Sequence, residues 1–231
     1  MSEVKKIVSS ALPSRKRCAE EKEDAITSPG LLTKDDGDGW RWYDKSLLFF
    51  ETTPRTVASP LIAAFDYDGC LANTSLFIKG PDAWSVLFPG QTEEALKALH
   101  GAGFKLVIMT NQSAIGKAKG SFDKTVAEKK GRLCGFVNKV GLPFQIFVAT
   151  AGDTKNPDKY RKPETGMWDF LQKYANQGVP IDMTKSFFVG DAAGRKKDHG
   201  DSDLKLAKNA GVKFFTEDVF FKEGCYKDLL K

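Results

Sequence analysis

The sequence predicts an α/β fold built on a Rossmann-like, doubly wound parallel sheet without a large cap. Short apolar runs alternate along the chain with longer stretches of helical spacing. The runs are apolar throughout, which is typical of strands buried on both faces of a parallel sheet. No insertion long enough to form a large cap separates these segments. We therefore expect helices on both faces of the sheet and an open site at the carboxyl ends of its strands.

Five apolar runs predict the strands, at residues 61–65, 105–109, 145–149, 186–189 and 212–215. Four stretches predict helices, at residues 92–103, 124–141, 164–178 and 203–211. The first helical stretch opens with Thr92 as a capping residue, has acids in its first turn and ends in glycine. Pro163 precedes the third stretch, and proline favours the first turn of a helix.

The composition of the chain changes near residue 40. Residues 1–39 contain no aromatic residue and are rich in Ser, Lys, Glu, Asp and Gly, so they cannot bury enough apolar surface to offset chain entropy. We expect a disordered polar tail over residues 1–39 and one folded domain over residues 40–231. Within the tail, the basic cluster PSRKR (13–17) is of the nuclear-localisation type.

Charge and cysteine usage restrict the class of protein further. The tail holds seven Lys/Arg and eight Asp/Glu, a net charge of −1, while the whole chain carries +5. The domain therefore carries +6, which weakly indicates a polyanionic partner. No apolar run approaches the roughly 20 residues of a membrane helix, and the N-terminus lacks the apolar core of a secretory signal. The four cysteines form no C-x-x-C pair, which argues against a disulfide framework or a zinc site. An intracellular protein is expected.

Polar residues follow several of the predicted strands. Asp66 comes directly after residues 61–65, and Thr110 comes directly after residues 105–109. Asp191 follows residues 186–189, and Lys162 lies on the loop after residues 145–149. Because parallel strands end at the same edge of the sheet, these side chains should lie close together.

Asp68 adds a second carboxylate to this group, since residues two apart on an extended segment point the same way. Carboxylates gathered at one place repel unless a cation lies among them, and an oxygen-rich site with room for water suits Mg²⁺. One carboxylate can attack phosphorus and carry the phosphoryl group, while the other acts as general acid and base. Gly69 lets the backbone approach a phosphate closely.

The four strings DYDG, TNQ, RKP and GDAAGR resemble the four motifs of haloacid dehalogenase superfamily phosphatases. Three longer strings, VIMTNQSAIGK, YRKPETGMWDFLQ and FFVGDAAGRKKDHGDSDLKLAKNAG, are similar to the phosphatase domain of the polynucleotide kinase 3′-phosphatase family, which removes 3′-phosphates from broken DNA ends. The resemblance covers about residues 40–222. It implies a haloacid dehalogenase fold, with a phosphatase domain at residues 40–231.

The resemblance also implies roles for individual residues. Asp66 would be the nucleophile and Asp68 the general acid and base, with Thr110 and Lys162 binding the phosphoryl group. Mg²⁺ would be held by Asp66, Asp191 and the backbone carbonyl of Asp68. Asp198 and Asp203 match further acidic positions of the last motif. The residues expected to bind substrate are Asn111, Gln112, Arg161, Arg195, Lys196 and Lys197.

The sequence departs from the family pattern in three places. Cys70 stands where the family usually has Thr, so a supporting hydroxyl bond is expected to be missing. The loop at residues 151–160 is longer than usual. GDAAGR also runs directly into KKD, where the bifunctional animal enzymes carry extra residues, which affects the placement of Asp198 and Asp203.

The expected substrate is DNA with a 3′-phosphate at nicks, gaps or breaks, and the expected setting is DNA single-strand break and base excision repair. The chain has no G-x-x-x-x-G-K-[ST] loop, so no 5′-kinase activity is expected. We expect a monomer in the nucleus, with the mitochondrion as the alternative location.

Two other functions compete with this one. The first is a phosphatase of the histidinol-phosphate or heptose-bisphosphate type. Many of those carry a Cys/His zinc loop, whereas residues 143–160 contain neither Cys nor His. The second is a pseudoenzyme that only binds DNA ends, which predicts the loss of Asp66 or Asp68, although both are present.

Overall fold

The computed structural model describes residues 32–52, 55–75, 77–152 and 158–231. Its main sheet has eight strands in the order β1-β2-β3-β8-β7-β4-β9-β10. The last five strands in this order are parallel to one another. They are β8 (Phe144–Ala149), β7 (Lys105–Asn111), β4 (Ile62–Phe65), β9 (Phe187–Val189) and β10 (Lys213–Phe215). Each coincides with a predicted strand, so the expected α/β fold with a parallel sheet is confirmed.

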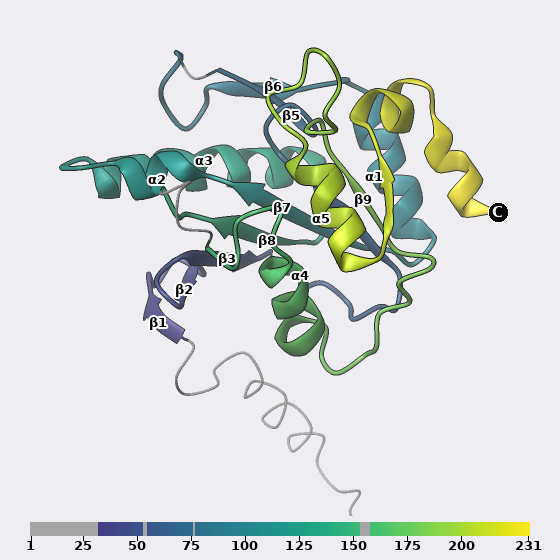
Figure 1. Cartoon of the computed structure of the whole chain (residues 1–231), viewed down its shortest axis with the longest axis horizontal. Helices are drawn as coiled ribbons and strands as arrows, with labels where there is room; N and C mark the ends of the chain where they lie inside the picture. Colours follow the sequence, from purple (N-terminus) through teal and green to yellow (C-terminus); the bar gives the residue numbers. More distant parts are fainter. Residues whose placement is uncertain (1–31, 53–54, 76, 153–157) are drawn as a thin grey trace, which may run out of the picture.

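Three antiparallel strands extend this sheet at one side. They are β1 (Leu32–Asp35), β2 (Arg41–Tyr43) and β3 (Leu47–Glu51), and β3 pairs with β8. The boundary predicted at residue 40 therefore falls inside this meander, and residues 32–39 do not belong to a tail. Residues 1–31, including the basic cluster at 13–17, lie outside the described residues (Figure 1).

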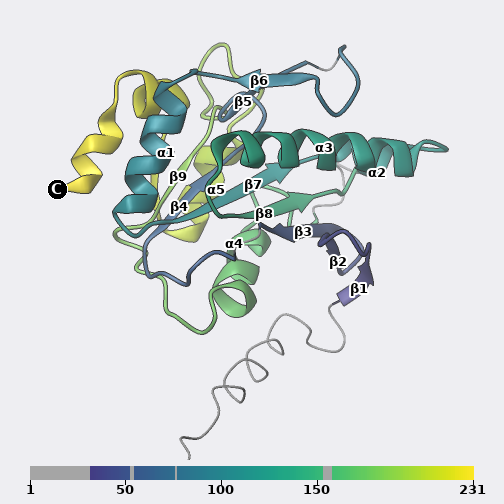
Figure 2. The ribbon, with the colours of Figure 1, turned by 180° about the vertical axis from the view of Figure 1, so that it is seen from behind.

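Helices cover both faces of the sheet. α1 (Gln91–Gly101) and α3 (Phe122–Val140) lie on one face, and they come to the front in Figure 2. The other face carries α4 (Gly166–Phe170), its continuation η1 (Leu171–Ala175) and α5 (Ser202–Ala210) (Figure 1). Alternate residues of β4 point into the two cores: Ala63 and Phe65 into the first, Ile62 and Ala64 into the second. The short helices α2 (Ser113–Lys117), η2 (Asp218–Lys222) and η3 (Cys225–Leu230) complete the fold.

Two helix starts differ from the sequence prediction. α1 is capped at Gly90, whose backbone N–H donates to the Glu93 carboxylate at 2.7 Å, and Thr92 is buried inside the first turn. Thr92 is therefore not the cap, because the acid at the third helical position supplies the capping bond. The third predicted helix starts at Gly166 and continues from Leu171 as a π-helical turn.

A two-stranded hairpin takes the place of a large cap. It consists of β5 (Ala72–Thr74) and β6 (Trp84–Val86), which pair with each other, and it lies above α3 in both views of the molecule (Figures 1 and 2). We refer to residues 72–86 as the hairpin. Among the described helices, none is long and apolar enough to cross a membrane.

A buried lysine ties the far end of the sheet to η1. Lys105, at the start of β7, is 3% exposed, and its ammonium donates to the Ala175 carbonyl at 2.6 Å and to the Asn176 side-chain oxygen at 3.3 Å. Burial lowers the pKa of Lys105 to about 8, although the Glu51 charge opposes the shift. Both acceptors have a second donor, since Gln145 also donates to Ala175 and the Ser59 backbone also donates to Asn176.

Lys105→Met should therefore change the pH dependence of stability rather than the fold. In the wild type, the folded state loses the Lys105 proton near pH 8, whereas the unfolded chain keeps it to about pH 10.5, so Lys105 destabilises the fold less as pH rises through this window. We expect the wild type to gain on the order of 2 kcal/mol relative to Lys105→Met between pH 8 and pH 10.5. Urea unfolding across this range measures the difference. A constant difference would show that Lys105 stays protonated.

Candidate active site

The carboxylate of Asp66 lies at the carboxyl end of β4, between two neighbouring strand ends. Its backbone N–H donates to the Val189 carbonyl at the end of β9 at 2.9 Å, which continues the sheet pairing by one residue. The side chain is 9% exposed. Asp66 therefore sits on rigid backbone, as a nucleophile requires.

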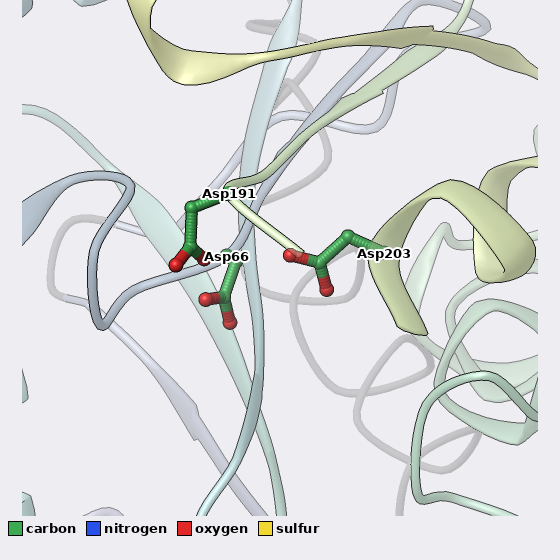
Figure 3. Close-up of side chains that lie close together, drawn as sticks. All are labelled: Asp66, Asp191 and Asp203. Atoms are coloured by element: carbon green, nitrogen blue, oxygen red, sulfur yellow. The ribbon is translucent and has the colours of Figure 1, made fainter. Parts of the chain in front are cut away.

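Three carboxylates meet at this point (Figure 3). Oxygen atoms of Asp66, Asp191 and Asp203 all lie within 4.8 Å of one another. Asp191 follows β9, and Asp203 lies in the first turn of α5. The predicted cluster of Asp66 with Asp191 is present, and its third side chain is that of Asp203.

Lys162 is the cation that faces these acids. Its ammonium lies 2.5 Å from the Asp66 carboxylate and 2.8 Å from that of Asp203, and the side chain is almost completely buried. Burial alone would lower the pKa of Lys162, but the charges of Asp203 and Asp66 outweigh it and raise the pKa above its usual value. Lys162 therefore stays charged at neutral pH.

One lysine does not balance three carboxylates. Burial raises the pKa of Asp66 well above 3.8, and the charges of Asp203 and Asp191 raise it further against the effect of Lys162. Burial and the Asp203 charge also raise the pKa of Asp191. Both shifts have the same physical cause, which is negative charge held in a poorly solvated place.

The donor set fits a divalent cation. Oδ1 of Asp191 is buried and has no hydrogen-bond partner among the described residues, and it belongs to the same cluster as Asp66. Two carboxylates with room for water and a substrate oxygen are the ligands that Mg²⁺ prefers. Asp203 belongs to the same cluster, is paired with Lys162 and also accepts from the Ala192 backbone N–H at 3.1 Å, and its role as a metal ligand stays a prediction.

Asp68 lies beside this cluster, and its carboxylate is held separately. Oδ1 accepts a hydrogen bond from the Thr74 hydroxyl at 2.5 Å, and Oδ2 accepts one from the Gln112 side-chain amide. The sequence spacing placed Asp68 among the cluster acids, but the carboxylate cluster that the described residues form consists of Asp66, Asp191 and Asp203. The side chain of Asp68 is thus available for proton transfer.

The TNQ string supplies three different contacts. Thr110 is buried at the end of β7, where its hydroxyl accepts from the Gln112 amide at 3.0 Å. Asn111 donates to the Lys162 carbonyl at 3.0 Å and accepts from the Lys162 N–H at 2.9 Å, which fixes the loop that carries the lysine. Asn111 and Gln112 thus hold Lys162 and Asp68, and the expectation that they bind substrate stays a prediction.

Cys70 contributes a hydrogen bond of its own, although it has no hydroxyl group. Its thiol donates to the Val189 carbonyl at 3.4 Å, a normal length for sulfur. The side chain is completely buried. Cys70 therefore links the residues after β4 to the end of β9.

Arg195 and Asp198 brace the loop after β9. The Arg195 guanidinium donates to the Asp191 carbonyl at 3.1 Å and pairs with three acids, at 3.0 Å to Asp198 and 3.1 Å to Glu217 and Asp218. Asp198 also accepts from two backbone N–H groups of this loop. Arg195 is thus committed to the protein, and Asp198 lies outside the carboxylate cluster, so neither is placed to bind substrate or metal.

The other predicted substrate-binding cations differ in their surroundings. Lys196 and Lys197 are exposed and have no ion pair among the described residues, as is also true of Lys117 and Lys119. Arg161 is half-buried, and its Nη1 has no hydrogen-bond partner in the described part of the chain. These residues remain predicted contacts for substrate.

The fold is of the haloacid dehalogenase type. A solved structure of a putative had-like phosphatase from Mesorhizobium loti matches with a TM-score of 0.55 at 23% identity, covering 72% of this chain and 77% of that chain. This likeness establishes the fold. The motif resemblance drawn from the sequence agrees with it.

The chain belongs to the polynucleotide kinase 3 phosphatase family, whose model matches residues 61–221. It is 44% identical over 208 residues to polynucleotide 3′-phosphatase ZDP of Arabidopsis thaliana, an alignment that covers 88% of this chain and 29% of that protein. It is also 30% identical over 140 residues to D-glycero-beta-D-manno-heptose-1,7-bisphosphate 7-phosphatase of Rhodopseudomonas palustris, covering 56% of this chain and 71% of that protein. The chain therefore spans less than a third of the length of its plant relative.

Sequence reasoning missed two contributors to the site. Thr74 was not singled out, although its place six residues after Asp68 put it near the acid. Arg132 lies in the middle of a predicted helix and is almost completely buried. The sequence alone carried no signal of this burial, which became visible only in the structure.

Gly69→Ala should abolish phosphatase activity by displacing Asp191. A Cβ on Gly69 would lie 2.5 Å from the nearer Asp191 oxygen, and φ +83° would add strain. Gly211→Ala is the matched control, because its φ is +77° and nothing lies within 4 Å of its Cβ. We expect both variants to lose roughly 1 kcal/mol of stability, whereas activity falls by at least about 100-fold in Gly69→Ala alone. Equal activity of the two variants would contradict the contact.

Proposed function

We propose that this chain is a Mg²⁺-dependent DNA 3′-phosphatase that converts 3′-phosphate ends at strand breaks into 3′-hydroxyl ends. The observation that carries the proposal is the position of Asp66, held on rigid backbone between Lys162 and Asp191, with Asp68 fixed beside it. Membership of the family and the identity to a polynucleotide 3′-phosphatase support the choice of substrate.

The reaction follows from the arrangement of the side chains. Asp66 attacks phosphorus, the bond from phosphorus to the 3′-oxygen breaks, and the leaving oxygen takes a proton from Asp68. Asp68 then takes a proton from water, whose oxygen attacks the aspartyl-phosphate and releases inorganic phosphate. Lys162, which pairs with Asp66, and the buried Thr110 hydroxyl are the groups proposed to contact the phosphoryl oxygens.

Asp66, Asp191 and the backbone carbonyl of Asp68 are the groups proposed to hold Mg²⁺. When bound, the ion supplies positive charge to the phosphoryl oxygens. The surplus of carboxylate over lysine charge and the unpartnered Oδ1 of Asp191 support this assignment.

Access to the site suits the end of a polymer. The part of the chain described here places a small hairpin beside the site, and exposed lysines occupy two loops next to it. A heptose-bisphosphate type of substrate is the second candidate, because a relative with that name aligns with this chain. The absence of Cys and His from residues 143–160 favours DNA.

The wider setting belongs to the same proposal. DNA single-strand break repair consumes 3′-hydroxyl ends, so it is the process that this activity would serve, in the nucleus if the basic cluster at residues 13–17 acts as a signal. We propose that this chain transfers no phosphate to 5′-hydroxyl ends, because its sequence contains no G-x-x-x-x-G-K-[ST] loop.

A substrate panel tests the proposal directly. Purified protein with Mg²⁺ is expected to release phosphate from a nicked duplex carrying a 3′-phosphate, and to act far more slowly on histidinol phosphate and heptose bisphosphate. EDTA should stop the release. Asp66→Asn should abolish turnover with the fold intact, because the amide is nearly isosteric but is no nucleophile. Turnover of small phosphates alone would overturn the choice of DNA.

We expect the exposed side chains of Lys196 and Lys197 to contact phosphates of the DNA backbone. Replacing Lys196 and Lys197 by Gln is expected to raise KM for a 3′-phosphorylated duplex by about 3- to 10-fold. The salt dependence of kcat/KM should become less steep by about 1 to 2 logarithmic units per decade of salt. Arg195 is left unchanged, because it braces the Asp191 loop.

The control is the pair Lys208→Gln and Lys213→Gln, which removes the same charge from exposed positions at the end of α5 and the start of β10. Cleavage of a small aryl phosphate should be unchanged in both double variants. If both double variants changed KM for the duplex equally, the net charge of the protein would attract the substrate, and Lys196 and Lys197 would make no specific contact with it.

A further inference from the structure

Both carboxylate oxygens of Asp68 are engaged by neutral donors. The Thr74 hydroxyl lies 2.5 Å from Oδ1, and the Gln112 amide donates to Oδ2. The donors come from two separate elements, since Thr74 ends β5 of the hairpin and Gln112 follows β7 of the main sheet. Neither donor is charged, so each can orient Asp68 in its charged and its protonated form.

Thr74 is itself on a fixed support. Arg132 of α3 donates from Nε to the Gly80 carbonyl at 2.9 Å and from Nη2 to the Ile78 carbonyl at 2.8 Å, and it is 2% exposed. The hairpin loop is thus bound to α3 at its backbone. This attachment does not need a bound substrate.

Two glycines of α3 allow the hairpin to approach so closely. A Cβ on Gly131 would overlap Pro81, and a Cβ on Gly135 would lie 3.0 Å from the Trp84 ring. Arg132 lies between them in the chain. The hairpin is therefore seated on α3 by shape as well as by hydrogen bonds, and Thr74 has a defined position.

We propose that Thr74 and Gln112 are positioning residues that hold the Asp68 carboxyl group toward the leaving oxygen before substrate binds. This inference rests on the proposed phosphatase function and adds the source of the acid's orientation. Gln112 also holds the Thr110 hydroxyl, so it sets the acid and a phosphoryl-binding group together. Thr74 touches only Asp68 among the groups of the site that the structure describes, and it offers the cleaner test.

The proposed role makes one step sensitive to Thr74. In the first half-reaction, the bond from phosphorus to the ester oxygen breaks and that oxygen receives the Asp68 proton. An alkyl ester needs this proton because its alkoxide is strongly basic, whereas 4-nitrophenolate leaves without it. A misplaced Asp68 therefore slows alkyl esters and spares the nitrophenyl ester.

The test compares kcat/KM for glycerol 2-phosphate and 4-nitrophenyl phosphate, since kcat/KM reports the steps up to release of the first product. Thr74→Val, which keeps the shape and removes the hydroxyl, is expected to lower kcat/KM for the alkyl ester by about 10-fold or more and for the nitrophenyl ester by less than about 3-fold. Thr74→Ser should restore the alkyl value. Asp68→Asn should show the same selectivity more strongly.

Asn73→Ala serves as the control, because Asn73 is exposed on the same strand. It should leave both esters unaffected. Equal loss on the two esters in Thr74→Val, or full activity on the alkyl ester, would overturn the proposal, and thermal unfolding identifies a variant whose fold has failed. Both test substrates are small molecules, so the positioning role can be tested even if DNA is not the substrate. A wild type that hydrolyses the two esters but no DNA would overturn the DNA function alone.

Discussion

The buried ion pairs of Lys162 with Asp66 and Asp203 are the constraint around which the site is built. Isolating these charges from water costs free energy that is recovered only if the partners keep good geometry. The lysine lies on a loop, whereas Asp66 and Asp203 lie at the start or end of regular elements. The fold must therefore bring a loop to a sheet edge and hold it there within tenths of an ångström.

Several features of the chain serve that constraint. Asn111 binds the backbone of Lys162 through both polar atoms of its amide, which joins the end of β7 to the lysine loop. Gly190 leaves space for the Asp203 carboxylate, since a Cβ at that position would overlap it. Arg195 connects the Asp191 carbonyl to acids on η2 and before it, so the loop after β9 is held from the far side. The residues that hold the site are thus more numerous than those that react.

Much of this could be predicted from the sequence, and the exceptions share a cause. The parallel strands and the acids at their ends follow from local apolar runs and from the rule that such strands end together. The bond from Gln112 to Asp68 could not be predicted, because the two residues lie 44 positions apart in the chain. The basic run at residues 195–197 predicted three substrate-binding cations. Lys196 and Lys197 are exposed, but the Arg195 guanidinium is paired with acids of the protein. The antiparallel meander was missed because the pairing of β3 with β8 depends on residues about 100 positions apart.

The thiol of Cys70 has a consequence for how the protein meets oxidants and alkylating reagents. Burial raises the pKa of this thiol well above 9, and the carboxylates of Asp66 and Asp203 raise it further, so almost none of it is thiolate. Because the thiolate is the reactive form, Cys70, four residues after Asp66, is a poor nucleophile. The reagents that inactivate enzymes with cysteine nucleophiles therefore find no target at this position while the chain is folded.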